Sequence, residues 1–180
     1  MVYCFLADGF EELEAIAPID MLKRAGIDVV TVGVTGKNVT GSHGITFVAD
    51  IVAEEITLTN SVQAVILPGG MPGTINLEKS AEVQKAIDFA CENGKYLCAI
   101  CAAPSILGHK GLLKGKKATA FPGFEKDLEG AVVNGDFVAV DGKFITAKGA
   151  GVATEFGLEI VRCLVSAEKS EEIRKAIQSK

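Results

Sequence analysis

The chain has 180 residues, a length that suits a single domain with one hydrophobic core. Hydrophobic residues make up 48% and charged residues 23%, which excludes a disordered chain. The formal net charge of −5, with 6% aromatic residues and no Trp, argues against nucleic acid as a partner. No apolar run approaches the ~20 residues that span a membrane. We therefore expect one domain over residues 1–180 that binds neither nucleic acid nor membranes.

The five cysteines are irregularly spaced, and the apolar run at 2–7 meets acidic residues too early to be a signal peptide. These features predict a cytoplasmic protein with reduced thiols. Cys98 and Cys101 have the spacing of a redox pair. Residues three apart on a strand point to opposite faces, however, so two independent thiols are the favoured interpretation.

Strand and helix patterns alternate along the chain. The expected strands cover residues 2–6, 27–34, 64–67 and 96–100, with weaker short strands at 38–50. The expected helices cover residues 11–25, 77–91, 103–107, 152–165 and 170–179.

Two turn signals near the C-terminal third predict hairpins. Asn134-Gly135 lies between apolar runs at 131–133 and 137–140, and Asp141-Gly142 joins the second run to 144–146. The whole order predicts an α/β fold, a three-layer α/β/α sandwich with a mostly parallel sheet and an antiparallel accessory hairpin.

Ligands of open parallel sheets bind beyond the carboxyl ends of the strands. The segments expected there, 8–14, 68–73 and 99–104, carry neither the glycine pattern of a dinucleotide site nor a P-loop. The histidines, His43 and His109, have no paired-ligand spacing near a cysteine. We therefore expect no nucleotide, no metal and no other cofactor.

Cys101 follows the expected strand 96–100 directly, and Pro104 suits the first turn of the helix after it. Such a strand-to-helix turn, a nucleophile elbow, often has strained backbone angles that present its side chain above the sheet. A helix N-terminus favours the thiolate, and backbone N–H groups of Ala102 and the Gly69-Gly70 turn could hold an oxyanion. The alternative is a small buried cysteine packed under a helix. The turn favours a reactive thiol.

Glu14 is the second candidate, because a carboxyl in an apolar cleft beside a thiolate would stay protonated. Glu11, Glu12 and Glu14 also suit a solvated helix start, and spacing alone favours that simpler interpretation. His43 is interpreted as a surface histidine.

Four ordered segments together resemble the ThiJ/PfpI superfamily, in its DJ-one and YajL-like branch, from about residue 2 to residue 168. They are 7–14 (ADGFEELE), 67–70 (LPGG), 99–104 (AICAAP) and 148–151 (KGAG). The resemblance implies a flavodoxin-like sandwich, a homodimer and a redox-sensitive nucleophilic cysteine. It places Cys101 as nucleophile, Glu14 as the protonated carboxyl, and Gly70 and Ala102 as backbone donors, which reverses the interpretation of Glu14.

The sequence also departs from the family pattern. Phe121 stands where many relatives carry a histidine near the cysteine, and Ala102 stands where the protease-like branch has one. Glutamine amidotransferases use a histidine downstream of the cysteine, and none follows His109. Arg24 and His43 match positions that are basic in some relatives and face the thiol across the dimer. With Gly69 and Phe121 they complete the expected pocket.

The combined hypothesis is a cofactor-independent stress-response enzyme that acts on small reactive carbonyls. Its substrates would be α-oxoaldehydes such as glyoxal and methylglyoxal, or their early protein adducts, which it would convert to hydroxy acids. The alternative is an oxidative-stress sensor or redox-regulated chaperone in which Cys101 is oxidised without turnover. A cysteine amidase or peptidase is a weaker alternative, because no histidine base is expected beside Cys101.

Overall fold

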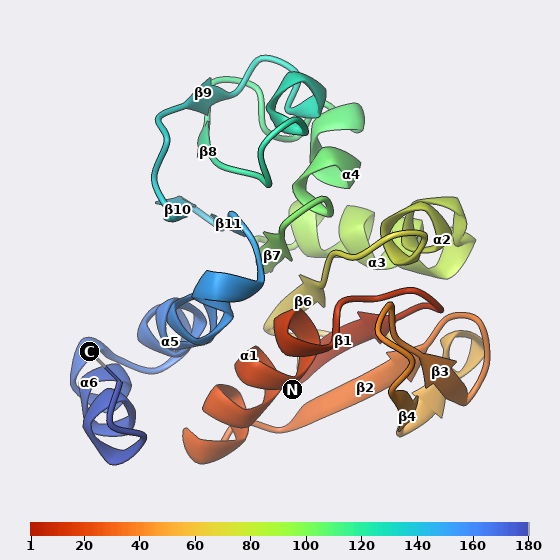
Figure 1. Cartoon of the computed structure of the whole chain (residues 1–180), viewed down its shortest axis with the longest axis horizontal. Coiled ribbons are helices and arrows are strands. Elements are labelled where there is room, and N and C mark those ends of the chain that lie inside the picture. The colour runs from red at the N-terminus through yellow and green to blue at the C-terminus, as the bar shows by residue number, and fades with distance from the viewer. Residues whose placement is uncertain (180) are drawn as a thin grey trace.

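In a computed structural model that describes residues 1–179, the chain forms a sheet of seven strands between two layers of helices (Figure 1). The strands of the central sheet are β1 (Val2–Leu6), β2 (Val29–Gly33), β5 (Ile51–Val52), β6 (Ala64–Leu67), β7 (Tyr96–Ile100), β10 (Val138–Asp141) and β11 (Phe144–Ala147). Two smaller sheets pair β3 (Asn38–Thr40) with β4 (Thr46–Val48), and β8 (Lys117–Ala118) with β9 (Val132–Val133).

Six α-helices and three short 3-10 turns connect the strands of residues 1–179. The α-helices are α1 (Glu12–Arg24), α2 (Gly73–Lys79), α3 (Ala81–Glu92), α4 (Pro104–His109), α5 (Ala153–Leu164) and α6 (Ala167–Ala176). The 3-10 turns are η1 (Ala53–Glu55), η2 (Glu125–Asp127) and η3 (Ala150–Val152). Among these described helices, none is long and apolar enough to cross a membrane.

The strand order across the central sheet is β10-β11-β7-β6-β1-β2-β5. Neighbouring strands are parallel except β10 and β11, which form the antiparallel hairpin expected at Asp141-Gly142. The chain proceeds from β1 to β2 on one side and later places β6 on the other side of β1. Ligands of open parallel sheets bind at such a reversal, beyond the carboxyl ends of the two strands, here β1 and β6. The expected three-layer fold is confirmed.

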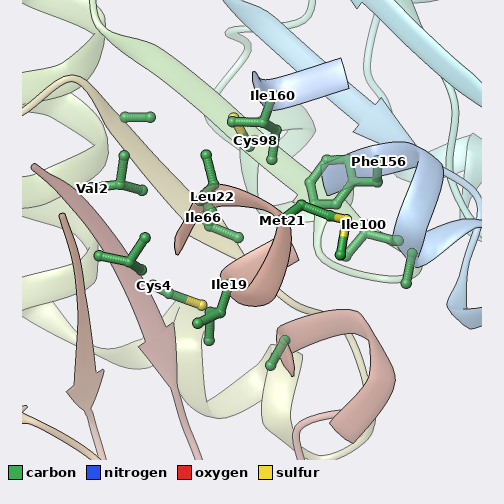
Figure 2. Close-up of a cluster of buried hydrophobic side chains, with 14 of the residues drawn as sticks. Val2, Cys4, Ile19, Met21, Leu22, Ile66, Cys98, Ile100, Phe156 and Ile160 are labelled. Atoms are coloured by element: carbon green, nitrogen blue, oxygen red, sulfur yellow. The ribbon is translucent and has the colours of Figure 1, made fainter. Parts of the chain in front are cut away.

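The inner strands β1 and β6 are buried on both faces, and alternate residues of β1 pack against the two helix layers. Val2, Cys4 and Leu6 face the layer that contains α1 and α5, whereas Tyr3 and Phe5 face the layer that contains α3 and α4. Figure 2 shows the first of these cores, where side chains of α1 and α5 lie against strand residues. The labelled members are Val2, Cys4, Ile19, Met21, Leu22, Ile66, Cys98, Ile100, Phe156 and Ile160.

Two expected elements are wrong. The apolar run at 131–133 does not pair with 137–140 across Asn134-Gly135, because β9 pairs in parallel with β8, and β10 pairs with β11. The single helix expected at 77–91 is divided into α2 and α3 at Ser80. Ser80 has extended backbone angles (φ −74°, ψ 123°) and its Oγ accepts the Val83 N–H at 3.3 Å, so it caps α3 and interrupts the helix.

Phe156 provides a test of the core between α5, α1 and the sheet, because its side chain is fully buried there. We expect Phe156→Ala to lower the free energy of unfolding by about 3–5 kcal/mol through lost burial and the cavity left behind. The control Val48→Ala, at an exposed position on β4, should change it by less than about 1 kcal/mol. Urea unfolding followed by circular dichroism measures both, and equal small losses would contradict the packing role of Phe156.

Candidate active site

Cys101 occupies a strained turn between β7 and α4. Its φ is +65°, in the left-handed region that non-glycine residues rarely adopt. Its N–H donates to the Ala147 carbonyl at 2.8 Å, and its own carbonyl accepts the Phe121 N–H at 2.8 Å. The turn is therefore held from the end of β11 and from the segment after β8, and the expected strained elbow is confirmed.

Glu14 lies on the first turns of α1 and is 1% exposed. Its N–H is capped by the Glu11 carboxylate at 2.8 Å, while its own Oε2 accepts the Gly69 N–H at 2.9 Å. The Ala150 backbone also hydrogen-bonds this carboxyl. The solvated helix start favoured by spacing alone is therefore wrong for Glu14, because its carboxyl is buried against the Gly69 turn.

Gly69 lies between the two candidate side chains. A Cβ added at Gly69 would approach the Cys101 Cβ to 2.6 Å and the Glu14 Oε2 to 2.7 Å. Any larger residue would therefore push the thiol and the carboxyl apart. With glycine there, the side chains of Glu14 and Cys101 share a hydrogen bond.

The Glu14 carboxyl titrates far from its ordinary range. Burial raises its pKa from 4.5 to about 7, against hydrogen bonds from Cys101, Gly69 and Ala150 that favour the charged form. The nearby Glu11 charge adds to the rise. Glu14 is therefore able to hold or release a proton near neutral pH, as a general acid or base must.

The Cys101 thiol does not have the lowered pKa expected from a helix N-terminus. Burial and then the Glu14 charge raise its pKa from 9.0 to about 12, while the Gly70 and Ala102 N–H groups act in the opposite direction. The helix after it, α4, has only six residues, which limits its electrostatic effect. The pair titrates together, and a thiolate forms when their shared proton lies on Glu14 rather than on Cys101.

Three of the other predicted residues lie beside Cys101 and Glu14, namely Gly70, Ala102 and Phe121. The remaining two, Arg24 and His43, do not. The Gly70 and Ala102 backbone groups hydrogen-bond the sulfur, and Phe121 is joined to the elbow through its N–H. Arg24, at the far end of α1, pairs with Asp20 at 2.8 Å. His43 pairs through Nδ1 with the Glu12 carboxylate at 2.9 Å. Neither basic residue contacts Cys101 within one chain.

Glu12 and His43 instead fix the loop between β3 and β4 to the start of α1. The His43 N–H donates to Glu12 Oε1 at 2.8 Å, and the Ser42 hydroxyl reaches Oε2 at 3.4 Å. Ligand atoms of Glu11, Glu12 and His43 lie within 4.8 Å of one another, a spacing that a cation would accept. The hydrogen bonds of Glu12 already explain its burial in this cluster.

The site also contains residues that were not predicted to belong to it, namely Ala147, Gly149 and Ala150. Ala147 accepts the elbow N–H, and Ala150 hydrogen-bonds Glu14. A Cβ at Gly149 would lie 3.2 Å from the Phe121 ring and 3.7 Å from Glu14 Oε1. For Gly149 and Ala150 the available signal was the segment 148–151, which carried part of the family resemblance without an assigned role.

Comparison with known proteins agrees with this arrangement. The sequence model of the DJ-1/PfpI family matches residues 1–163. This chain belongs to the DJ-1/PfpI family. That membership confirms the resemblance drawn from the four sequence segments.

Individual relatives cover most of the chain. It is 33% identical over 162 residues to a protein named deglycase from Pyrococcus abyssi, covering 88% of this chain and 95% of that protein. It is 36% identical over 172 residues to DJ-1 homolog A of Arabidopsis thaliana, covering 93% of this chain. The match spans only 44% of that plant protein's length. The structure titled "Toxoplasma gondii DJ-1, oxidized" superposes with a TM-score of 0.94 at 32% identity, covering 99% and 97% of the two chains.

The raised pKa of Glu14 predicts a pH-dependent stability. The carboxyl is more basic in the folded than in the unfolded chain, so its stabilising contribution is complete below pH 4.5 and is lost as pH rises through about 7. We expect Glu14→Gln to gain roughly 3 kcal/mol in unfolding free energy relative to wild type between pH 4 and pH 8.

Urea unfolding of both proteins across that pH range measures the difference, and Asp20→Asn, at an exposed carboxylate on the same helix, is the control. Parallel profiles of wild type and Glu14→Gln would contradict the shifted carboxyl.

Proposed function

We propose that this DJ-1/PfpI protein is a cofactor-independent cysteine enzyme that converts α-oxoaldehydes, or their early protein adducts, into hydroxy acids. The observation that carries the proposal is the hydrogen bond between Cys101 and a buried carboxyl whose pKa is about 7. The pair places a nucleophile, Cys101, beside a proton carrier, Glu14, and the conversion of an α-oxoaldehyde to a hydroxy acid needs both. The name of the Pyrococcus relative, a deglycase, supports the same class of reaction.

The reaction balances without an external oxidant. The shared proton moves to Glu14, and the Cys101 thiolate attacks the aldehyde carbon of methylglyoxal to give a hemithioacetal. The Gly70 and Ala102 N–H groups stabilise the oxyanion. Glu14 first gives the proton it took from the thiol to the hemithioacetal oxygen, which restores its carboxylate. The carboxylate then moves the proton from the former aldehyde carbon to the neighbouring carbon through an enediol, which oxidises the first carbon to a thioester and reduces the second to an alcohol. Water hydrolyses the thioester, releasing lactate and the Cys101 thiol.

A second function, oxidant sensing, is favoured by the accessibility of the same sulfur. Cys101 is partly exposed, and two backbone N–H groups beside it would stabilise an oxidised, negatively charged sulfur. The Toxoplasma relative is described as oxidized. An amidase or peptidase is less well supported, because His43 and His109 hydrogen-bond Glu12 and Glu78.

Replacing the nucleophile distinguishes turnover from a passive site. We expect Cys101→Ser to lower lactate formation from methylglyoxal at least about 100-fold, because serine is a far weaker nucleophile near neutral pH. Glu14→Gln should lower kcat by about 10²–10⁴-fold through loss of proton transfer. Lactate is measured by NMR, and Cys91→Ser, at an exposed free thiol, is the control that should keep full activity.

Unchanged lactate formation in Cys101→Ser would rule out the cysteine mechanism. If wild type forms no lactate but peroxide adds two oxygen atoms to Cys101 in intact and peptide mass spectra, the sensor function replaces it.

We also propose that the protein works as a cytoplasmic homodimer. Leu13 and Ile16 lie one helical turn apart on α1, and they are 60% and 41% exposed beside the candidate site. A second copy would cover these apolar side chains.

We expect Leu13→Glu to convert a dimer to monomers in sedimentation equilibrium, while Val48→Glu, on exposed β4, leaves the dimer unchanged. A wild-type monomer at all concentrations would contradict the dimer.

A further inference from the structure

An apolar hollow of about 340 Å³ adjoins the Cys101–Glu14 pair. Three segments line it: the turn after β8, the residue before β10, and the stretch from the end of β11 through η3. The lining residues are Phe121, Pro122, Phe137, Lys148, Gly149, Ala150, Gly151 and Val152. Its size falls within the ~300–1,000 Å³ typical of small-molecule pockets, and its lining is almost wholly apolar.

Two phenyl rings form much of this lining and stay open to solvent. Phe121 is 48% exposed and Phe137 is 67% exposed, although single exposed phenyl rings usually occur apart from one another. The Lys148 ammonium lies 4.9 Å from the centre of the Phe137 ring, close enough for a cation–π contact that favours one ring position. Gly149, Ala150 and Gly151 have little or no side chain, which leaves the space between the rings open.

Two residues of the hollow's lining lie next to the catalytic pair. The Phe121 N–H donates to the Cys101 carbonyl at 2.8 Å, so the residue that carries this ring is bound directly to the elbow. A single Cβ at Gly149 would contact both the Phe121 ring and Glu14 Oε1. A carbonyl carbon bonded to Cys101 would therefore have this hollow beside its substituent.

We propose that the hollow is a subsite for an aromatic substituent of the α-oxoaldehyde, so that aryl glyoxals are preferred to methylglyoxal. The assignment rests on the function proposed above and adds the substrate class. A methyl group leaves most of the hollow empty, whereas a phenyl group can stack against the two rings and displace water from apolar walls. The apolar lining offers few groups to bind a charged or hydroxylated substituent.

The test compares kcat/KM for phenylglyoxal and methylglyoxal in wild type and in Phe121→Ala, which keeps the backbone N–H to Cys101. We expect the ratio of kcat/KM for phenylglyoxal to kcat/KM for methylglyoxal to fall about 10-fold or more in Phe121→Ala. Phe137→Ala should act in the same direction. Phe89→Ala, at a half-buried phenylalanine on α3, is the control and should leave the ratio unchanged.

A phenylglyoxal to methylglyoxal ratio that stays constant in Phe121→Ala and Phe137→Ala would overturn the subsite. An equal loss of kcat/KM for both aldehydes would also overturn it, because Phe121 would then serve only to hold the turn at Cys101. A change of oligomeric state in Phe121→Ala with no change of ratio would show that a second copy fills the hollow, and would also overturn it.

A binding measurement separates the subsite from the proposed function. Acetophenone carries the phenyl group but no aldehyde, and its binding to Cys101→Ser is followed by saturation-transfer NMR with acetone as the reference. Phenyl-proton saturation that disappears in Cys101→Ser/Phe121→Ala supports the subsite even if neither aldehyde is converted. Absence of saturation in Cys101→Ser, without an aryl preference in turnover, overturns it.

Discussion

The burial of one carboxyl group, that of Glu14, is the constraint on which the candidate site depends. α1 begins just beyond the carboxyl end of β1, and the Gly69 N–H fixes Glu14 Oε2 at 2.9 Å. Removing a carboxylate from water is unfavourable, and the response is a proton held to about pH 7. The helix that closes the core on one face of the sheet thereby also places an acid–base group beside the sulfur.

The position of the sulfur depends on backbone strain that tertiary contacts stabilise. Cys101 is held at φ +65° by a hydrogen bond to Ala147, the last residue of β11, and by one from Phe121, which follows β8. Such a conformation costs of order 1–3 kcal/mol and persists only where the surroundings determine it. The antiparallel β10–β11 hairpin and the long connection after α4 thus have a structural role at the site, although both lie far from Cys101 in sequence.

The same surroundings oppose a free thiolate. Burial and the Glu14 charge raise the thiol pKa, and the Gly70 and Ala102 N–H groups oppose them. Transfer of the negative charge from Glu14 to the sulfur is therefore most favourable when the thiol proton passes to Glu14 as the sulfur attacks. An apolar hollow beside the pair, with Phe121 in its wall, lowers the local polarity further and favours proton transfer over full ionisation.

The sequence by itself determined the alternating fold, the turn at Cys101 and the glycine turn at Gly69-Gly70, because apolar periodicity, Pro104 and paired glycines act locally. The spacing of the acidic residues favoured a solvated Glu14, whereas the family resemblance indicated a carboxyl beside the cysteine. Only the tertiary structure decided for burial, because it packs the Glu14 carboxyl on the Gly69 turn. Tertiary structure also decided that β9 pairs with β8 rather than across Asn134-Gly135. It likewise placed Phe121 and Gly149 beside Cys101 and Glu14. Strand partners and contacts between distant segments depend on competition for backbone hydrogen bonds and for buried area, and local sequence patterns do not encode that competition.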